Sequence, residues 1–209
     1  MSQSAIEALG EALAGGAVAL VPTDTVYGLA AALDSEGGVS ALYALKGRPR
    51  SQPCQVLVYA PGLLEEALGP LDRRTRDAAL ALLPGPATCL VPDPEGRFAA
   101  ASGDAAGSVG VRAPAMEGPI RELRMFLVAT SANDPGGPDP ARLDQVPQRI
   151  RDAVRLSVDD GPLPGTASAV VDLREVGAGG PARLLRPGPE PAAVEGAVTR
   201  TGVQVARPD

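Results

Sequence analysis

Polar and cationic side chains stand beside several short apolar runs in this chain of 209 residues. Thr23 follows the first run, Arg112 ends a later one, Ser131 and Asn133 follow another, and Ser168 precedes the next. Hydroxyl, amide and guanidinium groups are donors that suit anionic ligands such as phosphates and carboxylates. Because ligands collect outside the strand ends of open α/β sheets, we expect these side chains to converge on one pocket.

A second set of cations lies between two apolar runs, in the segment KGRPR. It contains Lys46, Arg48 and Arg50, and Arg186 adds a further cation near the end of the chain. Lys46 is the single lysine among 19 basic residues. Either this position requires a compact ammonium, or the lysine remains by chance in a composition biased toward arginine. Ser108 adds a hydroxyl to the same inventory of anion-binding groups.

The composition excludes several classes of chemistry. The chain has no histidine and two isolated cysteines, so it lacks histidine-based triads and the usual zinc ligand sets. No phosphate-binding loop of the Gly-x-x-x-x-Gly-Lys-Ser/Thr type is present. The carboxylates available to a phosphate-bound magnesium ion, without the spacing of a dedicated metal site, are Asp24, Asp159, Asp160 and Asp172.

The hydrophobic pattern predicts the elements that position these groups. Apolar runs alternate with helical patterns throughout the chain, which predicts an α/β fold: a twisted mixed β-sheet with flanking helices and a cationic central cleft. Nothing resembles an interdomain linker, so we expect a single domain over residues 1–209. We expect the segment 92–107 to be a long loop of the kind that often forms lids. The predicted helices are 4–13, 39–45, 61–68, 72–83, 118–124 and 191–198, and the predicted strands are 17–21, 56–59, 88–91, 108–111, 126–129, 156–158, 169–173 and 183–185.

Seven segments resemble, in the same order, the motifs of the YrdC-like family. Each segment is weak evidence alone, but the ordered set is specific and extends from about residue 15 to residue 190. The segments are PTDTVYGL at 22–29, KGRP at 46–49, PGPAT at 84–88, VGVRAP at 109–114, TSAN at 130–133, SAVVD at 168–172 and RPG at 186–188. Three departures stand out. The serine usual shortly after TSAN is missing from Asp134-Pro135-Gly136, Cys54-Gln55 replaces the usual Leu-Ser after Pro53, and Ala169 replaces a threonine.

The resemblance implies L-threonylcarbamoyladenylate synthase activity. Such an enzyme joins L-threonine, bicarbonate and ATP into threonylcarbamoyl-AMP, releases pyrophosphate and uses Mg²⁺ with the ATP. Other proteins then transfer the threonylcarbamoyl group to the adenosine beside the anticodon of certain tRNAs, so tRNA is an indirect partner.

The resemblance also implies roles for the candidate residues. Lys46 and Arg48 are the expected catalytic contacts to the triphosphate. The expected ATP-binding set is Lys46, Arg48, Arg50, Ser108, Ser131 and Arg186, and the expected threonine-binding set is Thr23, Arg112, Asn133 and Ser168. No resident metal site is expected.

Other interpretations remain open for the same residues. Thr23, Asp24 and Thr25 also fit the capping of a turn, and the cations of the KGRPR segment fit a solvated charge cluster. For the whole chain, the alternatives are an RNA-binding or ribosome-assembly factor that uses the cationic cleft, and a carbamoyl-adenylating domain of another pathway. The net charge of −6 and the scarcity of aromatic residues disfavour single-strand RNA recognition.

The sequence also indicates where the protein works. No run of 18 or more apolar residues is present, and the first fourteen residues lack the positive charge of a secretory signal. We therefore expect a cytoplasmic protein with no membrane partner.

Overall fold

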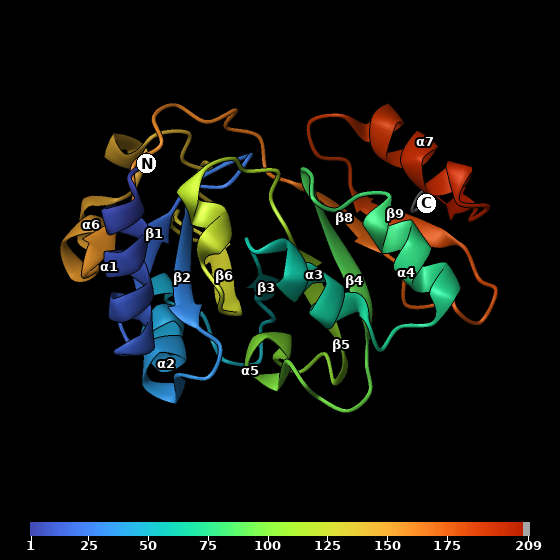
Figure 1. Cartoon of the computed structure of the whole chain (residues 1–209), viewed down its shortest axis with the longest axis horizontal. Coiled ribbons are helices and arrows are strands. Elements are labelled where there is room, and N and C mark those ends of the chain that lie inside the picture. Colours follow the sequence, from blue (N-terminus) through green and yellow to red (C-terminus); the bar gives the residue numbers. More distant parts are fainter. Residues whose placement is uncertain (207–209) are drawn as a thin grey trace.

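A single mixed β-sheet runs through the computed structural model, which describes residues 1–206 (Figure 1). The strand order is β10-β9-β8-β4-β5-β3-β6-β2-β1-β7, with both parallel and antiparallel neighbours. The expected α/β class and mixed sheet are thereby confirmed. The strands are β1 (Ala19–Val21), β2 (Gly28–Ala32), β3 (Gln55–Leu57), β4 (Ala87–Asp93), β5 (Gly107–Arg112), β6 (Leu127–Ser131), β7 (Leu156–Ser157), β8 (Ala169–Asp172), β9 (Ala182–Arg186) and β10 (Val205–Ala206).

Helices cover the two faces of this sheet unequally. A larger apolar core takes in residues of α2, α3, α4 and α7, and a smaller one forms where α1 and η1 pack on β1, β2 and β6. In Figure 1, α3, α4 and α7 gather around the half of the sheet that holds β4, β8 and β9. The helices are α1 (Gln3–Ala14), α2 (Glu36–Lys46), α3 (Pro61–Leu68), α4 (Arg73–Leu80), α5 (Ala99–Ser102), α6 (Gln148–Ala153) and α7 (Pro191–Arg200), with 3₁₀ turns η1 (Pro119–Glu122) and η2 (Leu143–Gln145).

The helix α2 ends exactly where the basic segment begins, which changes the expected setting of Lys46. The side chain of Ser35 caps the helix by accepting from the N–H of Gly38 at 3.2 Å. Gly47 then takes a left-handed conformation (φ 64°) that ends the helix, a role that glycine fills without steric cost. Lys46 is therefore the last helical residue and lies buried, whereas the predicted helix 39–45 stopped one residue before it and the KGRPR cations also fitted a solvated cluster.

Strand β2 was not predicted, and it changes how the first motif is presented. Its sequence, GLAAA, has little β-propensity, but all five residues are buried between β1 and β6. Residues 22–27 thus form the connection of a β1–β2 hairpin, since β1 and β2 are antiparallel neighbours. Also unpredicted were α5, α6 and β10.

The expected structureless loop at 92–107 is wrong. β4 continues to Asp93, α5 follows, and β5 begins at Gly107. The carboxylate of Asp93 accepts the backbone N–H groups of Arg97 and Phe98 at 3.0 and 2.9 Å, and Phe98 is buried in the core. The segment is therefore fastened to the sheet at several points.

Candidate functional site

A cavity of about 360 Å³ lies over the middle of the sheet, and seven of the ten predicted site residues line it. They come from the β1–β2 connection, the segment after α2, and the strands β5, β6, β8 and β9 or their flanks. The seven are Thr23, Arg48, Ser108, Arg112, Ser131, Ser168 and Arg186. The three that do not line the cavity are Lys46, Arg50 and Asn133.

Arginine side chains dominate the charged groups of the lining. Arg48, Arg112, Arg174 and Arg186 contribute guanidinium groups, and Asp139 is the one acidic residue among the lining residues of the described chain. Such a lining favours an anionic ligand, because guanidinium groups form paired hydrogen bonds with phosphates and carboxylates.

Lys46 holds the end of β6 from behind the cavity. Its Nζ donates to the carbonyl oxygen of Ser131 at 2.8 Å, to the carbonyl oxygen of Asn133 at 2.5 Å, and to Oδ1 of Asn133. These contacts use all three donors of the ammonium. Burial lowers the pKa of Lys46 to about 8, and the nearby charge of Arg48 acts in the same direction.

The side chain of Asn133 connects this contact to the following loop. Its Oδ1 accepts from Lys46 and from the Ser131 hydroxyl at 2.7 Å, and its Nδ2 donates to the carbonyl oxygen of Gly137 at 2.7 Å. Nδ2 also lies 3.3 Å from Oδ1 of Asp139, which places that carboxylate beside the Lys46–Asn133 pair. Asn133 therefore ties the end of β6, which carries Ser131, to the loop that brings Asp139 to the cavity.

Arg48 lines the cavity and links three segments. Its guanidinium donates to Oγ1 of Thr130, to the carbonyl oxygen of Pro53 and to Oε1 of Gln52, each at 3.1 Å. Arg50, two residues later, turns away and lies over the ring of Tyr43, 5.1 Å from its centroid. The structure thus brings Arg48 into the cavity and leaves Arg50 outside it.

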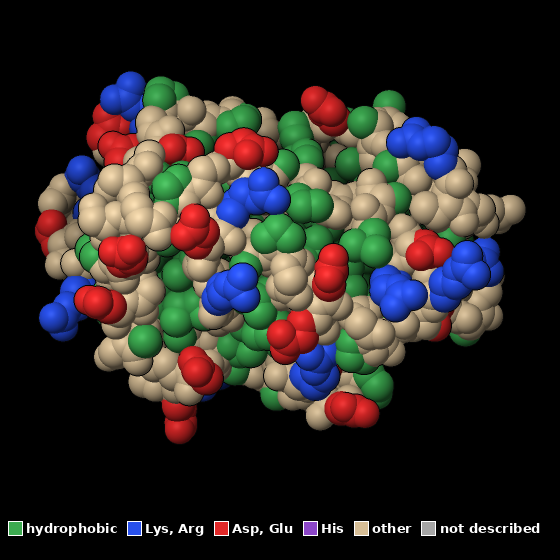
Figure 2. Space-filling model, in the orientation of Figure 1, with side chains coloured by type: hydrophobic (Ala, Val, Ile, Leu, Met, Phe, Trp, Pro, Cys, Tyr) green, Lys and Arg blue, Asp and Glu red, His purple; other side chains and the backbone are tan. Residues whose placement is uncertain are grey.

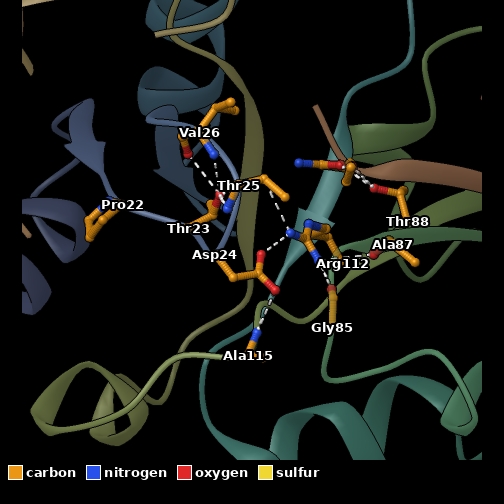
Figure 3. A network of polar contacts seen from close by, with 12 residues as sticks. Pro22, Thr23, Asp24, Thr25, Val26, Gly85, Ala87, Thr88, Arg112 and Ala115 are labelled. Atoms are coloured by element: carbon orange, nitrogen blue, oxygen red, sulfur yellow. Dashed lines mark hydrogen bonds and ion pairs between the residues drawn. The ribbon is translucent and has the colours of Figure 1, made fainter. Parts of the chain in front are cut away.

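Arg112 is almost fully buried, at 1% exposure, and its guanidinium is already paired (Figure 3). It contacts the carboxylate of Asp24 and the carbonyl oxygens of Gly85 and Ala87, the last at 3.1 Å. Burial lowers the pKa of Arg112, and the charge of Asp24 opposes that effect. Since both terminal nitrogens are occupied, the expected two-point grip on a threonine carboxylate would require Arg112 to release protein partners.

The connection that carries Asp24 is held by its own hydroxyls, as Figure 3 shows. Oγ1 of Thr23 donates to the carbonyl oxygen of Val26 at 2.7 Å and accepts the N–H groups of Thr25 and Val26. Asp24 in turn accepts the N–H of Ala115 at 2.9 Å. The turn-capping interpretation of Thr23 is therefore confirmed, and Thr23 lines the cavity as well.

Further hydroxyls meet beside Arg112, because Thr88 on β4 is its register partner. Oγ1 of Thr88 lies 3.1 Å from Oγ of Ser168 and donates to Oε1 of Gln55 at 2.9 Å, because β4 and β8 pair in parallel. Arg186 donates from Nε to the carbonyl oxygen of Ser168 at 2.8 Å. Gly188 fixes the turn after Arg186: its φ is 68°, and a Cβ there would meet the backbone nitrogen of Ala169 at 2.4 Å.

Several lining residues were missed by the sequence reasoning, among them Arg174, Asp139 and Thr88. Thr88 belongs to the PGPAT segment of the family motifs, so the sequence did contain a signal for it. Arg174 follows β8 by two residues and pairs with Asp172 through two contacts, at 2.8 and 2.6 Å. Burial raises the pKa of Asp172, but the hydrogen bonds from Arg174 outweigh it and hold the pKa below its usual value.

The carboxylates named for magnesium are largely committed to other partners. Asp24 contacts Arg112, Asp172 contacts Arg174, and Asp159 accepts from Tyr27 at 2.9 Å. Within residues 1–206, no group of three histidine, cysteine, aspartate or glutamate side chains is arranged to hold a metal ion. In the same range, no helix combines the length and apolarity needed to cross a membrane.

The motif order and the fold agree with known proteins. The sequence model of the Sua5/YciO/YrdC family, described as "Telomere recombination", matches residues 11–188. The chain belongs to this family. This membership confirms the resemblance on which the motif assignments rest.

Relatives within the Sua5/YciO/YrdC family have consistent names. A putative threonylcarbamoyl-AMP synthase of Mycobacterium tuberculosis is 35% identical over 191 residues, which cover 90% of this chain and 85% of that protein. The threonylcarbamoyl-AMP synthase of Pyrococcus abyssi is 31% identical, and the match covers 83% of this chain and 51% of the relative.

Solved structures of family members have the same fold. P. abyssi Sua5 complexed with L-threonine superimposes with a TM-score of 0.83 at 28% identity, over 99% of this chain and 60% of that chain. E. coli YciO superimposes with a TM-score of 0.76 over 90% of this chain, and at 18% identity this similarity supports the fold alone.

Proposed function

We propose that this chain is a threonylcarbamoyl-AMP synthase that uses L-threonine, bicarbonate and ATP. The main support for the proposal is the arginine-lined cavity, where residues from several of the family motifs lie together. The relatives of this chain are named threonylcarbamoyl-AMP synthases. The P. abyssi complex with L-threonine supports threonine as the amino acid. We propose further that the product serves tRNA modification through other proteins and that the enzyme acts in the cytoplasm.

The reaction needs two bond-forming steps. The neutral amine of threonine attacks the carbon of CO₂ derived from bicarbonate, loses a proton and becomes a carbamate. A carbamate oxygen then attacks the α-phosphorus of ATP, the bond to the bridging oxygen breaks, and pyrophosphate leaves. No protein nucleophile is required, so catalysis consists of positioning and of stabilising phosphate charge.

The cavity residues supply these two effects. Arg48 and the Ser131 hydroxyl hold the phosphates at the β6 end of the cavity, beside Lys46, and Ser108 is a further neutral donor. Arg174 and Arg186 add positive charge for the rest of the bound ATP at the β8–β9 end. Lys46 lies behind Ser131 and contributes positive charge. Its hydrogen bond to the carbonyl oxygen of Ser131 also fixes the end of β6.

Near the ends of β1 and β5, Thr23 and Arg112 form the wall against which threonine binds. Ser168 offers a hydroxyl there, whereas Asn133 acts through the loop that it organises. Arg112 keeps Asp24 in place, so the wall is rigid before the substrate arrives.

The residues present fit a magnesium ion brought in with ATP. Mg²⁺ is usually held by one or two carboxylates together with substrate phosphates, and Asp139 is the carboxylate that lines the cavity. When bound, the ion supplies neutralisation of phosphate charge. Asp139 lies beside Asn133 and Lys46, where the phosphates are proposed to bind.

The decisive experiment identifies the product by mass spectrometry after incubation with ATP, Mg²⁺, bicarbonate and a mixture of amino acids. We expect threonylcarbamoyl-AMP and one pyrophosphate per product, and omission of threonine, bicarbonate or Mg²⁺ should abolish both. Equal pyrophosphate release without threonine would refute the synthase.

Two variants and one binding assay make the test specific. Arg186→Ala should reduce product formation, while Arg73→Ala, at an exposed position on α4, is the matched control. Filter binding with tRNA tests the RNA-binding alternative directly. Figure 2 shows acidic and basic side chains interspersed on the face in view, which gives RNA no continuous basic stripe there.

A further inference from the structure

The arginine Arg149 joins two segments of the site from outside the cavity. It lies on α6, where the neighbouring Ile150 is fully buried and anchors the helix in the core. Its Nη1 donates to the carbonyl oxygen of Leu45 at 2.6 Å. Its Nε, at 2.9 Å, and its Nη2 both donate to Oδ1 of Asp134.

These contacts lie one residue away from the Lys46–Asn133 pair on both chain segments. Leu45 precedes Lys46 at the end of α2, and Asp134 follows Asn133 after β6. The carbonyl of Leu45 is among the last of α2, which have no partner within the helix. Arg149 therefore fixes the end of α2 to the loop after β6 at a second point.

We propose that Arg149 and Asp134 form a clamp that positions Lys46 against Ser131 and Asn133 for phosphate binding. The inference rests on the proposed function, because it assigns the clamp to the phosphate end of that cavity. Neither residue lines the cavity, so both are positioning residues and not catalytic ones.

The exposure of Arg149 and Asp134 indicates that the pair contributes to positioning more than to folding stability. Arg149 and Asp134 are 49% and 53% exposed, and ion pairs that exposed contribute little to folding. A displacement of catalytic groups by about 1 Å, in contrast, is able to cost a hundredfold in rate. Loss of the clamp should consequently affect catalysis far more than stability.

The clamp also acts on Lys46 through charge. Among the charged groups around its ammonium, Asp139 and Asp134 favour the protonated form and Arg48 and Arg149 disfavour it. Removing the carboxylate of Asp134 thus lowers the pKa of Lys46, and removing the guanidinium of Arg149 raises it.

The experiment compares Asp134→Asn, Arg149→Gln and the double variant with the wild-type protein. Each single variant should lower kcat/KM for ATP on the order of tenfold, with thermal midpoints within a few degrees, and the double variant should lose less than the sum of both. The alkaline limb of the pH–rate profile should move to lower pH in Asp134→Asn and to higher pH in Arg149→Gln. A merely structural pair would not produce opposite shifts.

The matched control is the exposed pair Arg142–Asp144, which has two similar contacts outside the cavity. Asp144→Asn should keep the wild-type kcat/KM and pH profile. Three results would overturn the clamp. They are wild-type kcat/KM in both clamp variants, a loss of kcat/KM no larger than that of Asp144→Asn, and alkaline limbs of the two pH–rate profiles that shift in the same direction.

The clamp and the proposed function fail in different ways. If the wild-type protein makes no threonylcarbamoyl-AMP, the proposed function is wrong. Calorimetric titration with a non-hydrolysable ATP analogue still measures the clamp, because both variants should bind it more weakly than Asp144→Asn does. Equal affinities would reject the clamp on their own.

Discussion

Replacing Lys46 with alanine should lower both stability and activity, and the structure gives the size of the first effect. Three oxygens receive hydrogen bonds from the ammonium. Oδ1 of Asn133 keeps the Ser131 hydroxyl as a donor, so the two carbonyl oxygens of Ser131 and Asn133 lose this donor. At about 1–3 kcal/mol for each buried acceptor without a partner, the free energy of unfolding should fall by about 2–6 kcal/mol.

For a domain of this size, that loss corresponds to a thermal midpoint lower by about 4–24 °C. Initial rates of synthesis should fall by a factor on the order of a hundred to a thousand, since one preorganised charge near the phosphates is removed. Lys46→Arg should recover neither quantity fully, because the three oxygens converge on one nitrogen and a planar guanidinium spreads its donors. The assays are urea and thermal unfolding together with initial rates of threonylcarbamoyl-AMP formation.

Two results would refute this reasoning. An alanine variant with an unchanged thermal midpoint would show that Lys46 does not hold the end of β6. Full activity in Lys46→Arg would show that the presence of the single lysine here is an accident of composition.

Three further predictions concern pH, the phosphate contacts and the segment 159–161. Because burial lowers the pKa of Lys46 to about 8, kcat/KM for ATP should fall above about pH 8 as the ammonium loses its proton. The contribution of this group to the free energy of unfolding should rise between pH 8 and its ordinary pKa of 10.5, because in that range the unfolded chain binds one more proton than the folded chain. Rates measured against pH test the first effect, and urea midpoints measured against pH test the second. Arg186→Ala should weaken ATP binding by about tenfold or more, while Arg50→Ala should change it by about twofold or less; calorimetry that finds the opposite order would place Arg50 in the site. Tyr27→Phe should lower the free energy of unfolding by about 1–3 kcal/mol, because the hydroxyl contacts Asp159 and accepts the N–H of Asp160; an unchanged urea midpoint would contradict this.

The sequence predicted the site better than it predicted the setting of each residue. Thr23, Arg112 and Ser131 were expected at or just after strand ends. Arg112 and Ser131 do end β5 and β6, Thr23 follows β1 by two residues, and all three line one cavity. Strand β2 was not predicted, because Gly28–Ala32 contains only small residues and one leucine. Its burial in the sheet, and not the β-propensity of its residues, makes it a strand. The short helix α5 was not predicted either, because its four residues, three alanines and a serine, show no amphipathic pattern.

Pairings between distant segments could not be read from the chain. Asp24 and Arg112 are 88 positions apart, and their contact exists only because the β1–β2 connection reaches the end of β5. Once Asp24 occupies that guanidinium, the free arginine expected from the strand end is no longer available. Lys46 illustrates the same limit, because its acceptors lie 85 and 87 positions away.

The arginines of the cavity each do two things, and this explains why the site uses so many of them. Arg48 donates to the carbonyl oxygen of Pro53, Arg112 to those of Gly85 and Ala87, and Arg186 to that of Ser168, while all three side chains also line the cavity.

A guanidinium has five donors in a rigid plane, so one side of it can fasten a neighbouring segment while its charge faces the ligand. An ammonium has only three donors, and Lys46 uses all of them on protein oxygens. Substituting lysine for a cavity arginine therefore removes a hydrogen bond to a neighbouring chain segment, even though it preserves the positive charge.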